Sequence, residues 1–102
     1  MFHVIEGRVR FRVGEREFTL ADGDTAVAPR GVPHSYRVES SQGARCLTMV
    51  RGAGFESLVR AASRPAEHDA LPAPMVPTPA MIDGLARTAA AHGIDLLGPP
   101  LA

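Results

Sequence analysis

The stretch from Arg8 to Gly14 constrains the fold most, because charged and apolar residues alternate strictly along it. The apolar face holds Val9, Phe11 and Val13, and the other face holds Arg8, Arg10 and Arg12. A period of two puts successive side chains on opposite faces of a β-strand, whereas a helix repeats every 3.6 residues. The stretch therefore predicts a half-buried strand. The arginine row is expected to be its solvated face, which discourages pairing with other strand edges.

Five other short segments in the first half of the chain also have strand character. They lie at residues 2–7, 17–20, 25–28, 34–38 and 45–50. Glycine, proline and polar turn residues separate them, as in antiparallel sandwiches and barrels. The first half is therefore expected to be a small β domain, and we set its bounds at residues 1–52.

The second half, residues 53–102, is expected to hold two helices and a proline-rich connector. Apolar residues at helical spacing predict the first helix over 55–62. Residues 63–79 contain five prolines, which favour an extended connector. Thr78 is a suitable N-cap for the second helix, and Gly93 is suited to end it.

Composition excludes some functions for this chain of 102 residues. Eleven basic residues balance eleven acidic ones, so the net charge gives nucleic acid or an anionic membrane no electrostatic reason to bind. No apolar run approaches the ~20 residues that cross a bilayer. The single cysteine, Cys46, fits a reducing cytoplasm. Because it lies in an apolar strand, we expect it to be a buried, inert thiol.

The turn before residues 34–38 has a distinctive spacing of glycine, proline and histidine. Gly23, Pro29, Gly31 and His34 match the spacing of the second motif of the cupins, with Val38 where that motif has Asn. Gly7 resembles the glycine that ends the first cupin motif. Residues 2–51 are therefore similar to a small single-domain cupin, and the segments after them resemble the tail of quercetin-dioxygenase-like small cupins.

This resemblance implies a mostly β fold, a cupin jelly-roll barrel with C-terminal α-helices. Metal-binding cupins hold the ion with three histidines and a glutamate. Counting back from Gly7 puts the family's glutamate one residue before Met1, and the His-x-His pair further upstream. The expected barrel is thus N-terminally shortened, and His34 is the one expected metal ligand that the chain contains. His3 has the opposite strand parity, while His68 and His92 fall in the connector and at a helix end.

The cupin resemblance also implies a ligand pocket around His34. Four residues share one strand face that is expected to point into the barrel: Val32, His34, Tyr36 and Val38. Two interpretations of His34 stay open. It is either a hydrogen-bonded core histidine or a metal ligand completed by groups from elsewhere. Tyr36 either lines a ligand pocket or only packs against its neighbours.

Two functional hypotheses follow from the resemblance. The first is a metal-free cupin that binds a small organic ligand or serves as a dimeric scaffold. The second is a metal-dependent, quercetin-dioxygenase-like enzyme in which Fe, Mn, Ni or Zn is held partly by His34. The exposed edge of a shortened barrel also predicts a homodimer with sheets paired between copies.

Overall fold

The computed structural model describes residues 1–102, which form two compact units. The first comprises Met1–Val50 together with Leu97–Ala102, and the second comprises Arg51–Leu96. The segment after Leu96 therefore belongs to the β unit, whereas the sequence grouped it with the helices. Each unit is described by itself below.

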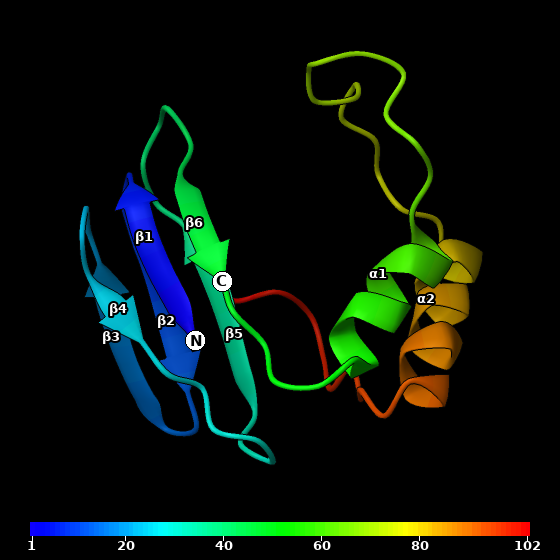
Figure 1. The fold of residues 1–102 in the computed structure, drawn as a ribbon, viewed down its shortest axis with the longest axis horizontal. Coiled ribbons are helices and arrows are strands. Elements are labelled where there is room, and N and C mark those ends of the chain that lie inside the picture. Colours follow the sequence, from blue (N-terminus) through cyan, green and yellow to red (C-terminus); the bar gives the residue numbers. More distant parts are fainter. The chain divides into compact units, whose positions relative to one another are not determined.

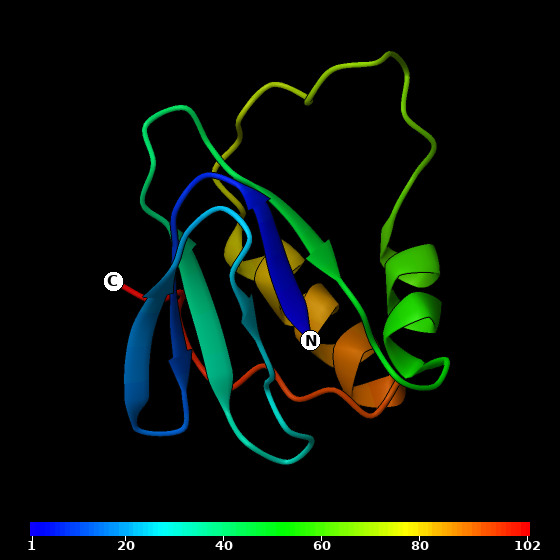
Figure 2. The same cartoon turned by 60° about the vertical axis from the view of Figure 1, so that its left-hand side comes forward.

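The first unit contains six strands: β1 (Phe2–Glu6), β2 (Val9–Val13), β3 (Arg16–Leu20), β4 (Thr25–Ala26), β5 (His34–Val38) and β6 (Arg45–Thr48). They make two antiparallel three-stranded sheets with the orders β4-β1-β6 and β3-β2-β5. Figures 1 and 2 show the two sheets face to face. The predicted strands are confirmed, and so is the mostly β class.

The apolar face of the alternating stretch supplies much of the core. Val9 and Phe11 from β2 are buried with Val4 of β1 and Leu20 of β3. Phe2, Phe18 and Ala26 pack against this cluster. Burying side chains of this size stabilises the fold by roughly 1.5–3 kcal/mol each. The core therefore lies between the sheets, on the side that strand parity predicts.

The opposite face of β2 carries an ion cluster. The Arg10 guanidinium donates to Glu17 in β3 at 2.5 Å and to Glu39, just after β5, at 2.6 Å. It also donates to the carbonyl oxygen of Ala102. The hydrogen bonds to Glu17 and then Glu39 raise the pKa of Arg10 above its already high ordinary value. Arg8 and Arg12 are exposed, so this strand face is solvated, and of its three arginines only Arg10 is held in ion pairs.

The turn between β3 and β4 ties the two sheets together. Backbone hydrogen bonds join Val4 to both Gly23 and Asp24, at 2.7 and 2.9 Å. The Asp22 carboxylate accepts from the backbone N–H of Gly7 at 2.8 Å. Gly23 and Gly31 of the cupin-like motif both have positive φ, of 86° and 82°, where glycine is favoured.

The second unit contains α1 (Gly54–Ala62) and α2 (Pro79–Ala91), with no helix or strand between them. The Thr78 hydroxyl accepts from the Met81 N–H at 3.2 Å, and Gly93 follows the helix with φ 75°. Both predicted caps are therefore confirmed. Only Leu58 and Ala89 are buried in this unit. Neither helix is long and apolar enough to span a membrane.

Candidate functional site

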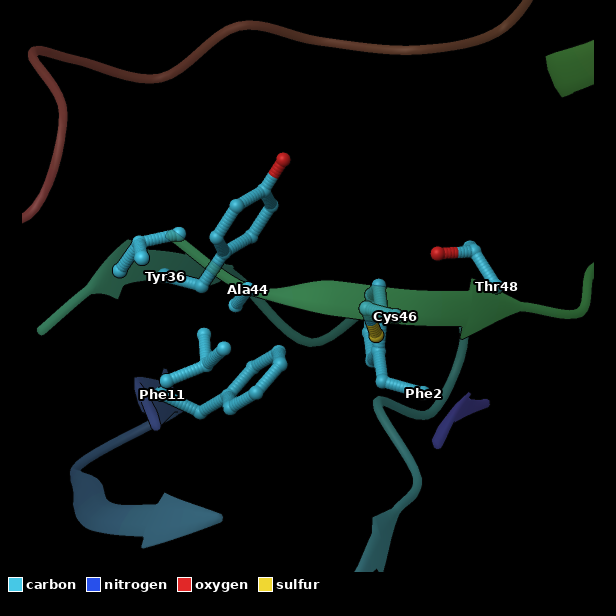
Figure 3. A pocket seen from close by; sticks show the side chains of 8 residues that line it. Phe2, Phe11, Tyr36, Ala44, Cys46 and Thr48 are labelled. Carbon is cyan, nitrogen blue, oxygen red and sulfur yellow. The ribbon is translucent and has the colours of Figure 1, made fainter. Parts of the chain in front are cut away.

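A cleft of about 280 Å³ lies between the two sheets, where β5 and β6 form the sheet edges. Residues from four strands, and one residue before β6, line it: Phe2, Val9, Phe11, Tyr36, Val38, Ala44, Cys46 and Thr48. Figure 3 shows how the side chains that line the cleft lie. The cleft is therefore continuous with the core between the sheets and opens at the edge strands β5 and β6.

Strand register explains why these residues meet. Phe2 of β1 is paired with Thr48 of β6, so the two side chains share the inner face of one sheet. Phe11 of β2 is paired with Tyr36 of β5 on the facing sheet. Because β5 has a strand on one side only, Tyr36 stays 56% exposed. The cleft is consequently deep at β1 and β2 and open at the edge strands.

Aromatic rings form the apolar floor and one wall of the cleft. The Phe2 and Phe11 ring centroids are 5.0 Å apart, and those of Phe11 and Tyr36 are 5.7 Å apart. Both pairs are tilted, an arrangement that aromatic rings prefer to direct face-to-face stacking. In Figure 3 the Tyr36 hydroxyl points away from Phe11. This wall offers flat apolar surface with one hydroxyl at its outer end.

The β6 side of the cleft is more polar. Thr48 contributes a hydroxyl and Cys46 a thiol, whose Sγ lies 3.8 Å from the Leu47 carbonyl oxygen. The prediction that Cys46 is buried is wrong, because the residue is exposed. Its side chain faces inward as parity requires, but no strand covers the far side of β6. The thiol is therefore accessible from the cleft.

Two of the four predicted pocket residues line the cleft, and two do not. Tyr36 and Val38 line the cleft, whereas Val32 and His34 do not. His34 is exposed, so the interpretation of a core histidine is wrong. It begins an edge strand, where nothing covers it. Its Nδ1 lies 3.1 Å from the Val32 carbonyl oxygen, and its ring centroid is 6.0 Å from that of Phe2.

The histidines do not come together into a metal centre. No three side chains among the histidines, cysteine, aspartates and glutamates of the chain lie close enough to hold an ion. His3 faces Thr25 instead, with 2.7 Å between its Nδ1 and the threonine hydroxyl. His92 lies in the second unit, where its Nδ1 is 2.8 Å from the Thr88 carbonyl oxygen. The residues present do not fit the ligand set that metal-binding cupins use.

Most of the cleft lining lies outside the predicted pocket. The additional residues are Phe2, Val9, Phe11, Ala44, Cys46 and Thr48. Each lies at an inward position of its strand, or just before one, so the period of two contained the signal. The periodicity does not show which strands distant in sequence pair with each other. That pairing decides which inward residues face each other across the cleft.

Comparison with known families agrees with this sheet arrangement. Residues 1–50 match the family model described as "Cupin domain". The chain belongs to the cupin superfamily. The resemblance drawn from Gly23, Pro29, Gly31 and His34 is therefore confirmed, together with the fold class. No curated protein and no solved structure matches the chain. In this cupin, the closer likeness to quercetin dioxygenases stays a prediction.

Proposed function

We propose that this cupin binds a small organic molecule in the cleft between its sheets, without a metal ion held by this chain. The observation that supports the proposal is the make-up of the cleft, in which aromatic and aliphatic walls meet a few polar groups. Ligand sites in proteins commonly combine apolar walls with a small number of placed polar atoms. The proposal concerns binding and assigns no reaction.

The size of the cleft limits the ligand to a compact molecule. A cavity of roughly 150 Å³ holds benzene, so a cleft of about 280 Å³ has room for one ring with substituents. Phe11 and Tyr36 offer surfaces against which such a ring would pack. The hydroxyls of Tyr36 and Thr48 and the Cys46 thiol can meet a hydroxyl or carboxyl group on it.

The chemistry of the lining favours binding over turnover. None of the residues that line the cleft has a carboxylate or imidazole side chain, so the cleft lacks the side chains that most often serve as general bases. His34 lies beside Phe2, outside the lining. The alternative function, a metal-dependent oxygenase, requires ligands that this set of residues does not supply.

The proposal is directly testable because the only tyrosine and the only cysteine of the chain both report on the cleft. The chain has one tyrosine, one cysteine and no tryptophan, and both Tyr36 and Cys46 line the cleft. Cyclohexanol and cyclohexanecarboxylate are suitable probes, because they are one-ring molecules that leave tyrosine fluorescence unobscured. We expect saturable slowing of Cys46 alkylation and a saturable change in Tyr36 fluorescence, with the same midpoint.

A matched pair of variants assigns the signal to the cleft. Val38→Leu adds bulk to the cleft lining and should weaken the binding of both probes severalfold. Val27→Leu adds bulk at a residue 59% exposed and outside the lining, and should leave binding unchanged. Linear, non-saturating effects of the probes, or equal effects of the two variants, would contradict the proposal.

Elemental analysis separates the metal-free proposal from its alternative. We expect purified protein to contain well under one equivalent of iron, manganese, nickel or zinc, because a single histidine holds such ions only adventitiously. His34→Ala should not change the metal content. A near-stoichiometric metal that is lost in His34→Ala would favour the oxygenase hypothesis instead.

A further inference from the structure

A second, polar cavity of about 240 Å³ lies in the first unit, where the end of β1 meets the loop between β5 and β6. Most of the residues that line it are charged or polar: Glu6, Ser40, Gln42 and Arg45. It shares only Ala44 with the aromatic cleft of the proposed function. The two proposals therefore rest on different side chains and can fail separately.

Opposite charges lie side by side at this cavity. Glu6, the last residue of β1, is the register partner of Arg45, the first residue of β6. The register shifts between Val4 and Glu6, so two residues of β1 oppose one residue of β6, as in a β-bulge. Opposite charges at paired positions attract each other, yet no ion pair joins Glu6 to Arg45. A carboxylate and a guanidinium thus line one cavity without neutralising each other.

The loop that forms the other side of the cavity is fixed by its own hydrogen bonds. The Gly43 N–H donates to the Ser40 carbonyl oxygen at 3.1 Å, and the Ser40 hydroxyl donates to the Gly43 carbonyl oxygen at 2.5 Å. The same hydroxyl accepts from the Arg8 N–H at 3.2 Å. Ala44 packs directly on the backbone of Gly7. Because the loop is already ordered, little ordering cost opposes the binding of a ligand.

We propose that this cavity binds a small zwitterion of the free α-amino acid class. The Arg45 guanidinium donates to the ligand carboxylate, and the Glu6 carboxylate accepts from the ligand ammonium group. Charge-assisted hydrogen bonds of this kind are stronger than neutral ones. A ligand with a single charge would leave either Glu6 or Arg45 unmatched. Electrostatic complementarity therefore favours a zwitterion over a simple anion or cation.

The size and lining of the cavity limit the side chain of the ligand. A cavity of roughly 150 Å³ holds benzene, so about 240 Å³ has room for an amino acid with a short side chain. The residues beside the charged pair are glycine, alanine and polar residues, which offer no wall for a large apolar side chain. Alanine and serine are the expected ligands. Since Glu6 and Arg45 are both exposed, we expect binding in the millimolar range.

The first test varies the ligand. L-alanine is added to the full chain labelled with ¹⁵N, and backbone amide signals are followed by NMR. We expect saturable shifts concentrated at residues 6–7 and 40–45. Alaninamide lacks the carboxylate and N-acetylalanine lacks the ammonium group, so each should bind at least tenfold more weakly. Equal binding of either analogue, or shifts that do not saturate, overturns the proposal.

The second test varies the protein. Glu6→Gln and Arg45→Gln each remove one charge at an exposed position, and each should weaken L-alanine binding about tenfold or more. The matched controls are Glu15→Gln and Arg12→Gln, which change the same residue types at exposed positions outside the cavity. They should leave binding unchanged. The amide spectrum of each variant without ligand checks that its fold is kept. Equal effects of the four variants would show general charge attraction and refute the site.

Discussion

At the scale of single residues, Gly7 is the glycine whose surroundings leave least room for a side chain. Its φ is +105°, and a Cβ built on it would lie 2.8 Å from the Cα and Cβ of Ala44 and from the Gly43 carbonyl oxygen. The loop before β6 therefore packs directly on the Gly7 backbone. Gly23 shares the positive φ but has nothing within 4 Å of a built Cβ. Comparing the same substitution at the two glycines therefore separates the cost of a positive φ from the cost of steric overlap.

We expect Gly7→Ala to destabilise the first unit more than Gly23→Ala. The positive φ alone costs roughly 1–2 kcal/mol for a residue with a Cβ, and the overlap at Gly7 should raise the loss to about 3 kcal/mol. Urea unfolding followed by Tyr36 fluorescence measures both losses, since the only tyrosine lies in this unit. Equal losses would show that the loop moves aside at no cost.

At the scale of the elements, Arg10 links three strands of one sheet. It projects from the central strand β2 to Glu17 in β3 and to Glu39 at the end of β5. The ion cluster lies on the face opposite the core. Arg12, two residues along the same strand, is exposed and forms no ion pair. Substituting each arginine in turn therefore compares one that forms ion pairs with one on the same strand that forms none.

We expect Arg10→Gln to lower the melting temperature more than Arg12→Gln, with the difference shrinking in high salt because salt screens partly exposed pairs. The pKa of Arg10 is raised in the folded state. Its contribution is therefore fully present below the unfolded pKa and is lost only as pH rises through the folded pKa. Thermal melts between about pH 6 and 9 should show a constant difference between the variants. A difference that collapses within this range would contradict the assignment.

At the scale of the whole molecule, the two units differ in how much they bury. The β unit has four buried core residues, whereas the helical unit buries Leu58 and Ala89. Helices of this length are marginal in water without such packing. Many apolar side chains of α1 and α2 stay half exposed, among them Phe55, Val59, Met81, Ile82 and Leu85. The free energy of opening should therefore differ between the units.

We expect amide hydrogens of β1 and β2 to exchange with solvent at least tenfold more slowly than those of α1 and α2. The reason is that amides exchange through local opening, and few buried contacts oppose opening in the helical unit. Hydrogen exchange of the full chain followed by mass spectrometry measures both units in one sample. Equal protection in the two units would mean that they open together.

Sequence by itself determined the local features of this protein. Alternation along Arg8–Gly14 depends only on the two-residue period of a strand, so it specified both the strand and its inner face. The spacing from Gly23 to His34 identified the cupin superfamily. The caps at Thr78 and Gly93 follow from backbone geometry within a few residues. Signals of this kind do not depend on distant parts of the chain.

Tertiary structure alone decided which inward side chains are covered. Parity directs a side chain toward the core, but its exposure depends on how many strands flank it and what faces it. Phe11, on the central strand β2, is buried, while Tyr36 opposite it on the edge strand β5 is largely exposed. The same difference exposes Cys46 and leaves His34 outside the cleft. Burial is a property of non-local pairing, and no local pattern encodes it.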